Sequence, residues 1–405
     1  MSTLPPAIIL GIDTPIGLSL IRELGKRGVP VCGVGRRADA IGAASRYCWM
    51  SRVRPADAAL GEWLPALIRE TDAAALLAIS ENDLIALAEL PDEIEGCKIL
   101  SPRAAPLDIV LDKRATLAQA QALGIDIPET WQPLAGEDFA AKAGAVTYPV
   151  VAKWPDPPRV MAALAAAGLS LEKAEFVADP AALLALLERT RALSLWPLIQ
   201  QYCPGQGLGQ MLFMDCGAAT LRFQHLRLHE WPPEGGVSTL CQVEPARLHQ
   251  PQMAKSEALL AAIGWQGPAM VEYRYDPLTG RYALMEINGR FWGSLPLATH
   301  AGAHFAWEAY RRAVLGDVTP ALLHREGLRA RYMIPETRRL LRLLFKRGKV
   351  ADPFFEVRPV RDLVSYLLGF FDPRMRYYLF SLRDPGPFLA DAKSVLLKAL
   401  RMGRP

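Results

Sequence analysis

Two carboxylates and an amide stand where a predicted β-hairpin could bring them together. The hairpin covers residues 269–288, with the turn-forming pentapeptide 276–280 at its centre. Because side chains alternate along a strand, Glu272 and Glu286 fall on one face, directly opposed or diagonally adjacent, about 5 to 8 Å apart. Like charges so placed repel, and with the side-chain oxygen of Asn288 they form the hard oxygen donor set that Mg²⁺ prefers. The pattern predicts a metal site; the alternative is a solvated face with unrelated acids.

Two lysines stand at the ends of predicted elements, where they could meet the phosphates of a nucleotide. Lys113 lies in a helix predicted over 106–124, and Lys153 ends a strand predicted over 148–153. An ammonium group is a compact cation that can neutralise phosphate charge. A lone lysine at a strand end is normally just solvated, which is the alternative for each of them.

The elements that must position these groups change in character along the chain. The opening alternates short apolar runs with helical patterns, which predicts a parallel sheet covered by helices. Its predicted strands are 7–12, 29–34, 74–79 and 98–100, and its predicted helices are 17–27 and 81–90. From residue 148 onward the pattern is mixed, with strands predicted at 148–153, 197–202 and 210–214 before the hairpin.

Several segments together resemble the ATP-grasp superfamily. The hairpin sequences Met270-Val271-Glu272-Tyr273 and Leu284 to Ser294 resemble its metal-binding strands, in which a Glu is followed by Glu-x-Asn-x-Arg. The remaining segments are Asp112-Lys113-Arg114, Gly124 to Pro128, Tyr148 to Lys153, and Leu198 to Gly205, which resembles the hinge beside the adenine. They occur in the family's order within residues 108–318.

The resemblance implies a fold class and three parts. We expect an α/β, Rossmann-like pre-ATP-grasp domain at 1–107 and an ATP-grasp domain of two α+β subdomains at 108–318. A basic helical extension follows at 319–405.

The resemblance also implies a role for individual residues. It assigns ATP binding to Lys113, Lys153, Gln200, Gln201, Tyr202, Cys203 and Glu286. It assigns metal binding to Glu272, Glu286 and Asn288, with two Mg²⁺ ions expected and Mn²⁺ able to replace them. Catalytic roles fall to Arg290 and Lys173. Substrate contacts fall to Arg227, Gly235, Gly236, Ser238, Gly293, Ser294 and Glu81; for the paired glycines a plain type II turn is the alternative.

The implied reaction is that of an ADP-forming carboxylate-amine ligase. ATP activates a small-molecule carboxylate as an acyl phosphate, and an amine displaces phosphate to form an amide or peptide bond. Other acceptors remain open, which would make the protein a thiol or CoA ligase or a kinase. A non-catalytic ATP-binding regulator is a further alternative. A distant one is an NADP oxidoreductase, suggested by Arg36 and Arg37 after the second strand.

One segment departs from the family. ATP-grasp proteins usually cover the phosphates with a glycine-rich loop, but residues 154–174 contain only Gly168. The departure concerns the lid over the phosphates and leaves the metal site untouched.

The net charge of +4 conceals an uneven distribution. Residues 319–405 hold 18 Lys and Arg against 8 Asp and Glu, so the extension carries +10 and the preceding body −6. A helix predicted over 336–347 places Arg338, Arg342 and Lys346 on one face. This extension could dock on the acidic body, lie on an anionic membrane, or contact a partner. No nucleic-acid motif occurs, so no nucleic-acid partner is expected.

The cysteines and the N-terminus bear on the compartment. Six scattered cysteines form no CxxC pair, which is typical of reduced thiols and predicts neither disulfides nor a zinc ribbon. The histidine pairs at 225/229 and 300/304 lack the HExxH pattern of a zinc site. No secretory signal is recognisable at the start, so we expect a cytoplasmic protein, with an oligomer possible.

Overall fold

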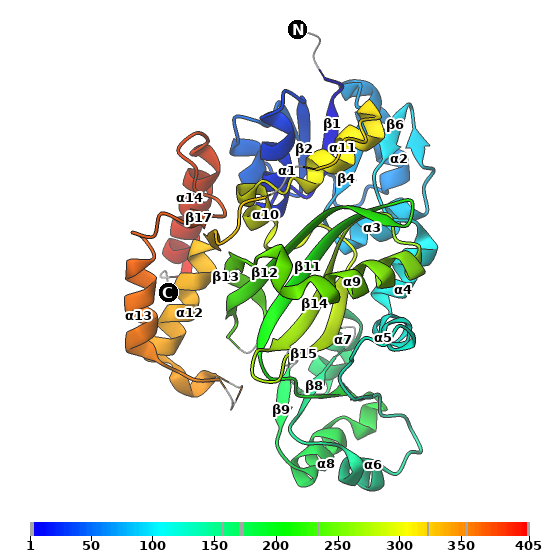
Figure 1. Ribbon diagram of the computed structural model, residues 1–405, viewed down its shortest axis with the longest axis vertical. Helices are drawn as coiled ribbons and strands as arrows, with labels where there is room; N and C mark the ends of the chain where they lie inside the picture. Colours follow the sequence, from blue (N-terminus) through cyan, green and yellow to red (C-terminus); the bar gives the residue numbers. More distant parts are fainter. Residues whose placement is uncertain are drawn as a thin grey trace.

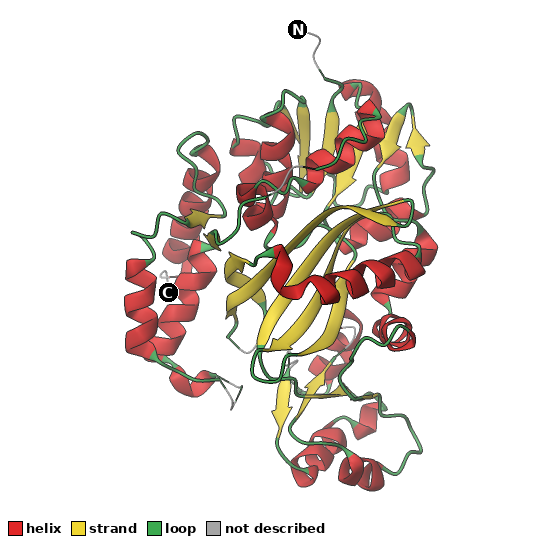
Figure 2. Cartoon of the chain, in the orientation of Figure 1, coloured by secondary structure: helices red, strands yellow, loops and turns green. Residues whose placement is uncertain are grey.

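The computed structural model describes residues 4–154, 157–169, 174–233, 235–321, 324–350, 352 and 355–402 (Figure 1). The described chain forms three sheets, each with helices packed around it (Figure 2). The seven-stranded third sheet lies between the first sheet and the four-stranded second sheet, and the C-terminal helices stand along one flank.

The first sheet has the order β3-β2-β1-β4-β6-β5 and is parallel except for β5. Its central strands are short apolar runs buried throughout, as expected when helices cover both faces of a parallel sheet. The strands are β1 (Ala7–Leu10), β2 (Val31–Gly35), β3 (Met50–Val53), β4 (Ala75–Ala78), β5 (Glu93–Ile94) and β6 (Cys97–Ile99). The helices are α1 (Pro15–Gly25), α2 (Leu60–Thr71) and α3 (Glu81–Ala88), with a 3₁₀ turn at Ile41–Ala44.

The single helix predicted over 106–124 is wrong in one respect, because it is divided in two. The segments are α4 (Ala104–Leu111) and α5 (Lys113–Ala122). Asp112 between them is extended, and its carboxylate accepts hydrogen bonds from the backbone N–H groups of Arg114 (2.8 Å) and Ala115 (3.2 Å). An acidic residue at this position caps a new helix, which makes Lys113 the first residue of α5.

The second sheet is antiparallel with the order β7-β10-β8-β9. One side carries buried aliphatic residues that pack against α8. The strands are β7 (Thr130–Trp131), β8 (Val150–Lys153), β9 (Glu175–Val177) and β10 (Leu198–Gln201). The helices are α6 (Phe139–Ala145), α7 (Pro157–Ala166) and α8 (Pro180–Arg189), followed by a 3₁₀ turn at Arg191–Leu193.

The third sheet has the order β15-β14-β11-β12-β13-β16-β17, and only its last pair is parallel. Its strands are β11 (Gln206–Asp215), β12 (Ala218–Trp231), β13 (Val237–Val243), β14 (Gly267–Asp276), β15 (Arg281–Asn288), β16 (Arg329–Arg331) and β17 (Met375–Tyr377). The helices that follow the chain here are α9 (Gln250–Ile263), α10 (Leu295–Ala301) and α11 (Phe305–Leu315), with a 3₁₀ turn at Ala246–His249.

The C-terminal extension packs on the body. Its strand β16 pairs with β13, so two strands of the extension complete the third sheet. Its helices are α12 (Met333–Phe345), α13 (Pro359–Leu368) and α14 (Gly386–Met402), with a 3₁₀ turn at Arg347–Lys349. No helix in the described ranges is long and apolar enough to cross a membrane.

We expected the basic extension to contact the body through its positive charges, but the ion pairs between them have the opposite polarity. Buried Asp384 of the extension pairs with Arg22 of α1 (Nε to Oδ2, 2.9 Å) and accepts hydrogen bonds from Ser45 Oγ and the Arg46 amide. Buried Glu336 pairs with His229 of β12 (2.6 Å). In both pairs the extension supplies the acid and the body supplies the base, so the basic surplus of the extension does not make these contacts.

Candidate active site

The two carboxylates of the hairpin lie directly opposite each other. In the register of β14 with β15, Glu272 is paired with Glu286, and Met270 with Asn288. A bulge follows between Glu272 and Tyr273. The prediction that both acids share one face is therefore confirmed, in the directly opposed register.

Each carboxylate has its own cation. Arg227 of β12 forms an ion pair with Glu272, and Lys113 Nζ lies 3.5 Å from Glu286 Oε2. Asn288 Nδ2 donates a hydrogen bond to Glu286 Oε1 (3.2 Å). The Nε of Arg227 is buried and has no hydrogen-bond partner among the described residues, which leaves donor capacity for an anion.

Their surroundings shift the pKa values of the two acids in opposite directions. Burial raises the pKa of Glu272 to about 7; Arg227 opposes this rise, and Glu286 adds to it. Burial acts in the same direction on Glu286, but the charges of Lys113 and Arg227 outweigh it and lower the pKa of that carboxyl. Two opposed carboxylates, one of them disfavoured as an anion, are a donor set that a divalent cation would stabilise.

A cleft of about 680 Å³ lies between the second and third sheets. Arg227 and the hairpin residues Arg274 and Met285 line it, whereas the cleft lining does not include Lys113, Glu272, Glu286 or Asn288. Lys153 lines the cleft, and its Nζ donates to Gln200 Oε1 (3.2 Å). Burial, together with the nearby cations Lys113 and Arg274, lowers the pKa of Lys153 to about 8. Burial and nearby cations disfavour the charged form of this ammonium group. A bound phosphate would favour the charged form, so the site is suited to bind an anion.

The hinge between the sheets follows β10. The backbone N–H groups of Gln201 and Tyr202 donate to Glu129 O (2.8 Å) and Pro149 O (3.0 Å). Gln201, Tyr202 and Cys203 all line the cleft, whereas the side chain of Gln200 is buried behind Lys153. The hinge thus presents its outer edge to the cleft while its two inner amides hold the second sheet together.

Arg290 connects the hairpin to the first sheet. It follows β15, and its Nε donates to Glu81 Oε1 at 3.0 Å. Glu81 begins α3 directly after β4, at the carboxyl end of a parallel strand, where open α/β sheets place ligands. Two residues predicted independently, one as catalytic and one as substrate-binding, are therefore in contact.

Several predicted substrate residues lie apart from the residues that line the cleft. The Gly236 amide donates to Glu230 Oε2 (3.0 Å), so this proposed anion-binding group already holds a carboxylate. Ser294 is buried, with its Oγ 3.4 Å from His225 Nε2. The cleft lining also does not include the predicted substrate residues Gly235, Ser238 and Gly293. Lys173 lies outside the described residues.

Other residues of the cleft were not predicted. Arg274 lies two residues beyond Glu272 on β14, so strand alternation alone could have indicated it. The cleft is also lined by Met285 of β15 and by the consecutive residues Leu228, His229 and Glu230 of β12. The extension contributes Arg339, Asp352, Phe355 and Glu356, which no local pattern could place there.

Solved structures with the same fold share little sequence with the chain. An N5-carboxyaminoimidazole ribonucleotide synthetase in complex with ADP matches with a TM-score of 0.63 at 13% identity, over 89% of this chain and 91% of that one. The biotin carboxylase domain of *Hydrogenobacter thermophilus* 2-oxoglutarate carboxylase, with MgADP and bicarbonate, has a TM-score of 0.60 at 12% identity, over 81% and 74%. *Rhizobium etli* pyruvate carboxylase has a TM-score of 0.58 at 16% identity; the match covers 80% of this chain but 30% of that longer one.

No protein-family model and no curated protein matches the chain. The structural similarity extends over most of the chain and confirms the predicted fold class. The chain has the ATP-grasp fold, preceded by a Rossmann-like domain and followed by a helical extension.

Proposed function

We propose that the protein is an ATP- and Mg²⁺-dependent ligase that joins a carboxylate to an amine and releases ADP. The observation that carries the proposal is the direct opposition of Glu272 and Glu286, with Lys113 3.5 Å from Glu286. Complexes of two enzymes of similar fold with ADP, one of them with magnesium, support a nucleotide site in this cleft.

The chain's own residues divide the work between the nucleotide and the metal. Lys153 and Lys113 neutralise phosphate charge, and the outer edge of the hinge at Tyr202 and Cys203 contacts the base. Glu272, Glu286 and the Asn288 oxygen hold Mg²⁺. A Mg²⁺ ion held there would offset the charge that develops on the transferred phosphoryl group.

The reacting carboxylate would be positioned by arginines. Arg290, fixed by Glu81, presents a planar guanidinium that can bind the substrate carboxylate or the transferred phosphoryl group with two parallel hydrogen bonds. Arg227, which pairs with Glu272, has an Nε–H group without a hydrogen-bond partner among the described residues. The amine then displaces phosphate from the acyl phosphate, so the protein contributes orientation and charge neutralisation without a covalent nucleophile.

The test is ADP release across pools of carboxylic acids and amines, with hydroxylamine added to capture an acyl phosphate as a hydroxamate. The proposal predicts acid-dependent, Mg²⁺-dependent ADP release and a hydroxamate product, both abolished in Glu272→Gln and Glu286→Gln. Glu257→Gln serves as a matched control, because that carboxylate pairs with Arg222 away from the cleft.

Other outcomes would identify another function. Release that requires a thiol indicates a thioester ligase, and a phosphorylated acceptor without hydroxamate indicates a kinase. Tight Mg-ATP binding with no release across the pools indicates a regulator. Each of these results contradicts amide formation while leaving the nucleotide site intact.

A further inference from the structure

The extension exposes far more large apolar side chains than the body. Fourteen large apolar side chains are exposed among the described residues from Leu341 to Leu397, against twelve in the whole of the described chain before residue 321. The most exposed include Leu382 (86%), Phe371 (84%) and Val360 (75%). Scattered apolar residues are ordinary on a protein surface, but a concentration in one small region marks an interaction site.

Helix α13 has its polar face turned inward. Asp362 accepts from Arg339 Nη2 (3.4 Å), and Tyr366 Oη lies 2.7 Å from Thr337 Oγ1, so the two residues attach α13 to α12. Arg331 Nη1 also donates to the Tyr366 carbonyl (3.0 Å). The opposite face carries the helix's exposed apolar side chains, which are Val360, Leu363, Val364, Leu367 and Leu368. A helix on a water-facing surface normally shows the reverse arrangement.

A band of aromatic rings joins α13 to α14. Ring centroids are 5.5 Å apart for Tyr366 and Phe370, 6.4 Å for Phe370 and Tyr377, and 6.3 Å for Tyr377 and Phe380. Phe380 in turn lies 5.4 Å from Phe388 of α14. A chain of aromatic contacts from Tyr366 to Phe388 therefore connects α13 to α14.

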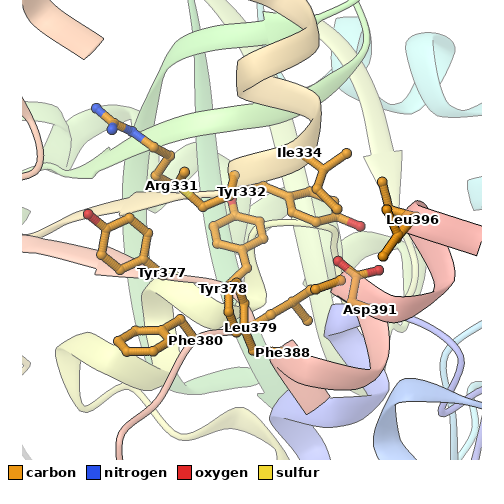
Figure 3. Close-up of a pocket in the computed structure, with 13 residues that line it drawn as sticks. Arg331, Tyr332, Ile334, Tyr377, Tyr378, Leu379, Phe380, Phe388, Asp391 and Leu396 are labelled. Atoms are coloured by element: carbon orange, nitrogen blue, oxygen red, sulfur yellow. The ribbon is translucent and has the colours of Figure 1, made fainter. Parts of the chain in front are cut away.

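An apolar pocket of about 400 Å³ lies along this band (Figure 3). It is formed by side chains from the start of α12, from β17 and the segment after it, and from α14. Phe380 and Leu396 are exposed at 39% and 60%, so the pocket opens onto the apolar surface. Tyr377 and Phe388 line it as well.

The extension keeps a surplus of positive charge because most of its acids are buried or paired with arginines, although Asp391 lines the pocket. Asp384 and Glu336 are buried against the body, and Asp362 and Asp372 pair with arginines of the extension. Arg358 and Arg374 pair with Glu356 and Asp372, which leaves exposed basic side chains at Arg338, Lys346, Arg347, Arg361, Arg383 and Lys393. The region thus combines an apolar surface with a surplus of exposed positive charge.

We propose that the outer surface of the extension docks on an anionic phospholipid bilayer. We define this docking surface as the outward side chains of α13 and α14 together with Phe370, Phe371, Phe380 and Leu382. Apolar side chains would enter the boundary between headgroups and acyl chains, the pocket would accept a chain end, and the surrounding bases would contact anionic headgroups. This inference is independent of the proposed ligase reaction.

Charge complementarity selects this occupant over a second copy of the chain. A two-fold dimer through the docking surface would bring the same basic patch against itself, so like charges would face each other. An anionic bilayer supplies both the negative charge and the apolar interior. It also offers a surface large enough to meet both helices at once.

The test is flotation of the full chain with vesicles of phosphatidylcholine, with and without phosphatidylglycerol. We expect binding to the anionic vesicles, at least about tenfold weaker binding to neutral vesicles, and release in about 0.5 M salt, where charges are screened within a few ångströms. Leu367→Glu/Phe371→Glu should weaken binding more than about tenfold, because two apolar side chains lose their burial. Arg361→Glu/Arg383→Glu tests the charge without touching the apolar surface.

The matched control is Leu134→Glu, a side chain 56% exposed in the loop between β7 and α6, which should bind like the wild type. Melting temperatures of all variants show that each is folded. The proposal is overturned if the folded wild-type chain fails to float with anionic vesicles, or if Leu134→Glu weakens binding as much as the α13 variant. It is equally overturned if the wild type forms a dimer that Leu367→Glu/Phe371→Glu dissociates while vesicle binding is absent.

Discussion

Glu272 of β14 faces Glu286 of β15 across the central hairpin, and each carboxylate is held by a different element. Arg227 reaches Glu272 from β12, and Lys113 reaches Glu286 from the start of α5. Two acids in direct opposition are unfavourable without compensating charge. In the free protein these two cations therefore offset the negative charge of the carboxylates. A metal ion and phosphates could take over part of that compensation.

The first prediction concerns the pH dependence of Mg²⁺ binding. Since burial raises the pKa of Glu272 to about 7, protons compete with the metal in the neutral range. Calorimetric titration of Mg²⁺ into the protein saturated with an ATP analogue should show affinity falling as the pH drops from 8 to 6, by up to about tenfold per unit. A flat profile in the wild type would contradict the account.

The same shift predicts a stability effect in the metal-free protein. A raised folded-state pKa stabilises the protein below the unfolded value, and this contribution is lost as pH rises through about 7. Denaturant unfolding should therefore show a smaller loss of stability between pH 5 and 8 for Glu272→Gln than for the wild type. Equal losses would mean that Glu272 ionises normally.

The second prediction concerns Lys153. Its pKa is lowered to about 8 by burial and by Lys113 and Arg274, so above this pH the free protein carries a neutral amine. ATP affinity should fall as pH rises through 8, approaching about tenfold per unit. Affinities are measured by fluorescence titration with ATP at each pH. Lys153→Arg keeps the charge at all these pH values and should give a flatter profile, even if its affinity is lower. Parallel profiles would remove Lys153 from phosphate binding.

The third prediction concerns the attachment of the extension. Asp384→Ala leaves Arg22 buried without its carboxylate, which should lower the free energy of unfolding by about 3 kcal/mol. Arg22→Met/Asp384→Leu removes both charges and should recover much of that loss. Asp39→Ala, in an exposed pair with Arg37, should leave the melting temperature unchanged. An Asp384→Ala variant as stable as the wild type would show that this pair does not hold the extension.

The fourth prediction concerns Arg290. Arg290→Lys retains a positive charge but loses the planar fork and the Nε contact with Glu81, so turnover should fall more than about tenfold. ATP affinity, set by the lysines and the hinge, should change little. Glu81→Gln keeps a hydrogen-bond acceptor and should reduce turnover less. Steady-state rates and nucleotide titrations separate the two effects; a parallel loss of ATP affinity would place Arg290 in nucleotide binding instead.

Local patterns predicted the parts of the site that depend on alternation and turn chemistry. The pentapeptide at 276–280 predicted the hairpin, and strand alternation put Glu272 and Glu286 on one face. The turn left two registers open, and only the structure shows the directly opposed one and the bulge beside Glu272. The parallel first sheet follows from short apolar runs between helical patterns. Periodicity alone missed the break at Asp112, because the apolar pattern runs through it. The family resemblance did place the start of a helix at Asp112-Lys113-Arg114, where the capping carboxylate begins α5.

Long-range contacts were beyond local patterns. Arg227 was predicted to touch substrate, and its ion pair with Glu272 depends on the pairing of strands far apart in sequence. Composition indicated that the extension is basic but not that its few acids make the contacts with Arg22 and His229. The entry of Arg339 into the cleft depends on how α12 packs against β12.

The position of the metal tests the central claim most directly. Crystals grown with ADP and Mn²⁺, measured at a wavelength where manganese scatters anomalously, would locate both ion and nucleotide. We expect an anomalous peak between the carboxylates of Glu272 and Glu286, with the ADP phosphates beside it and close to Lys153. Nucleotide bound in the cleft with manganese ligated elsewhere, or nucleotide bound outside the cleft, would contradict it.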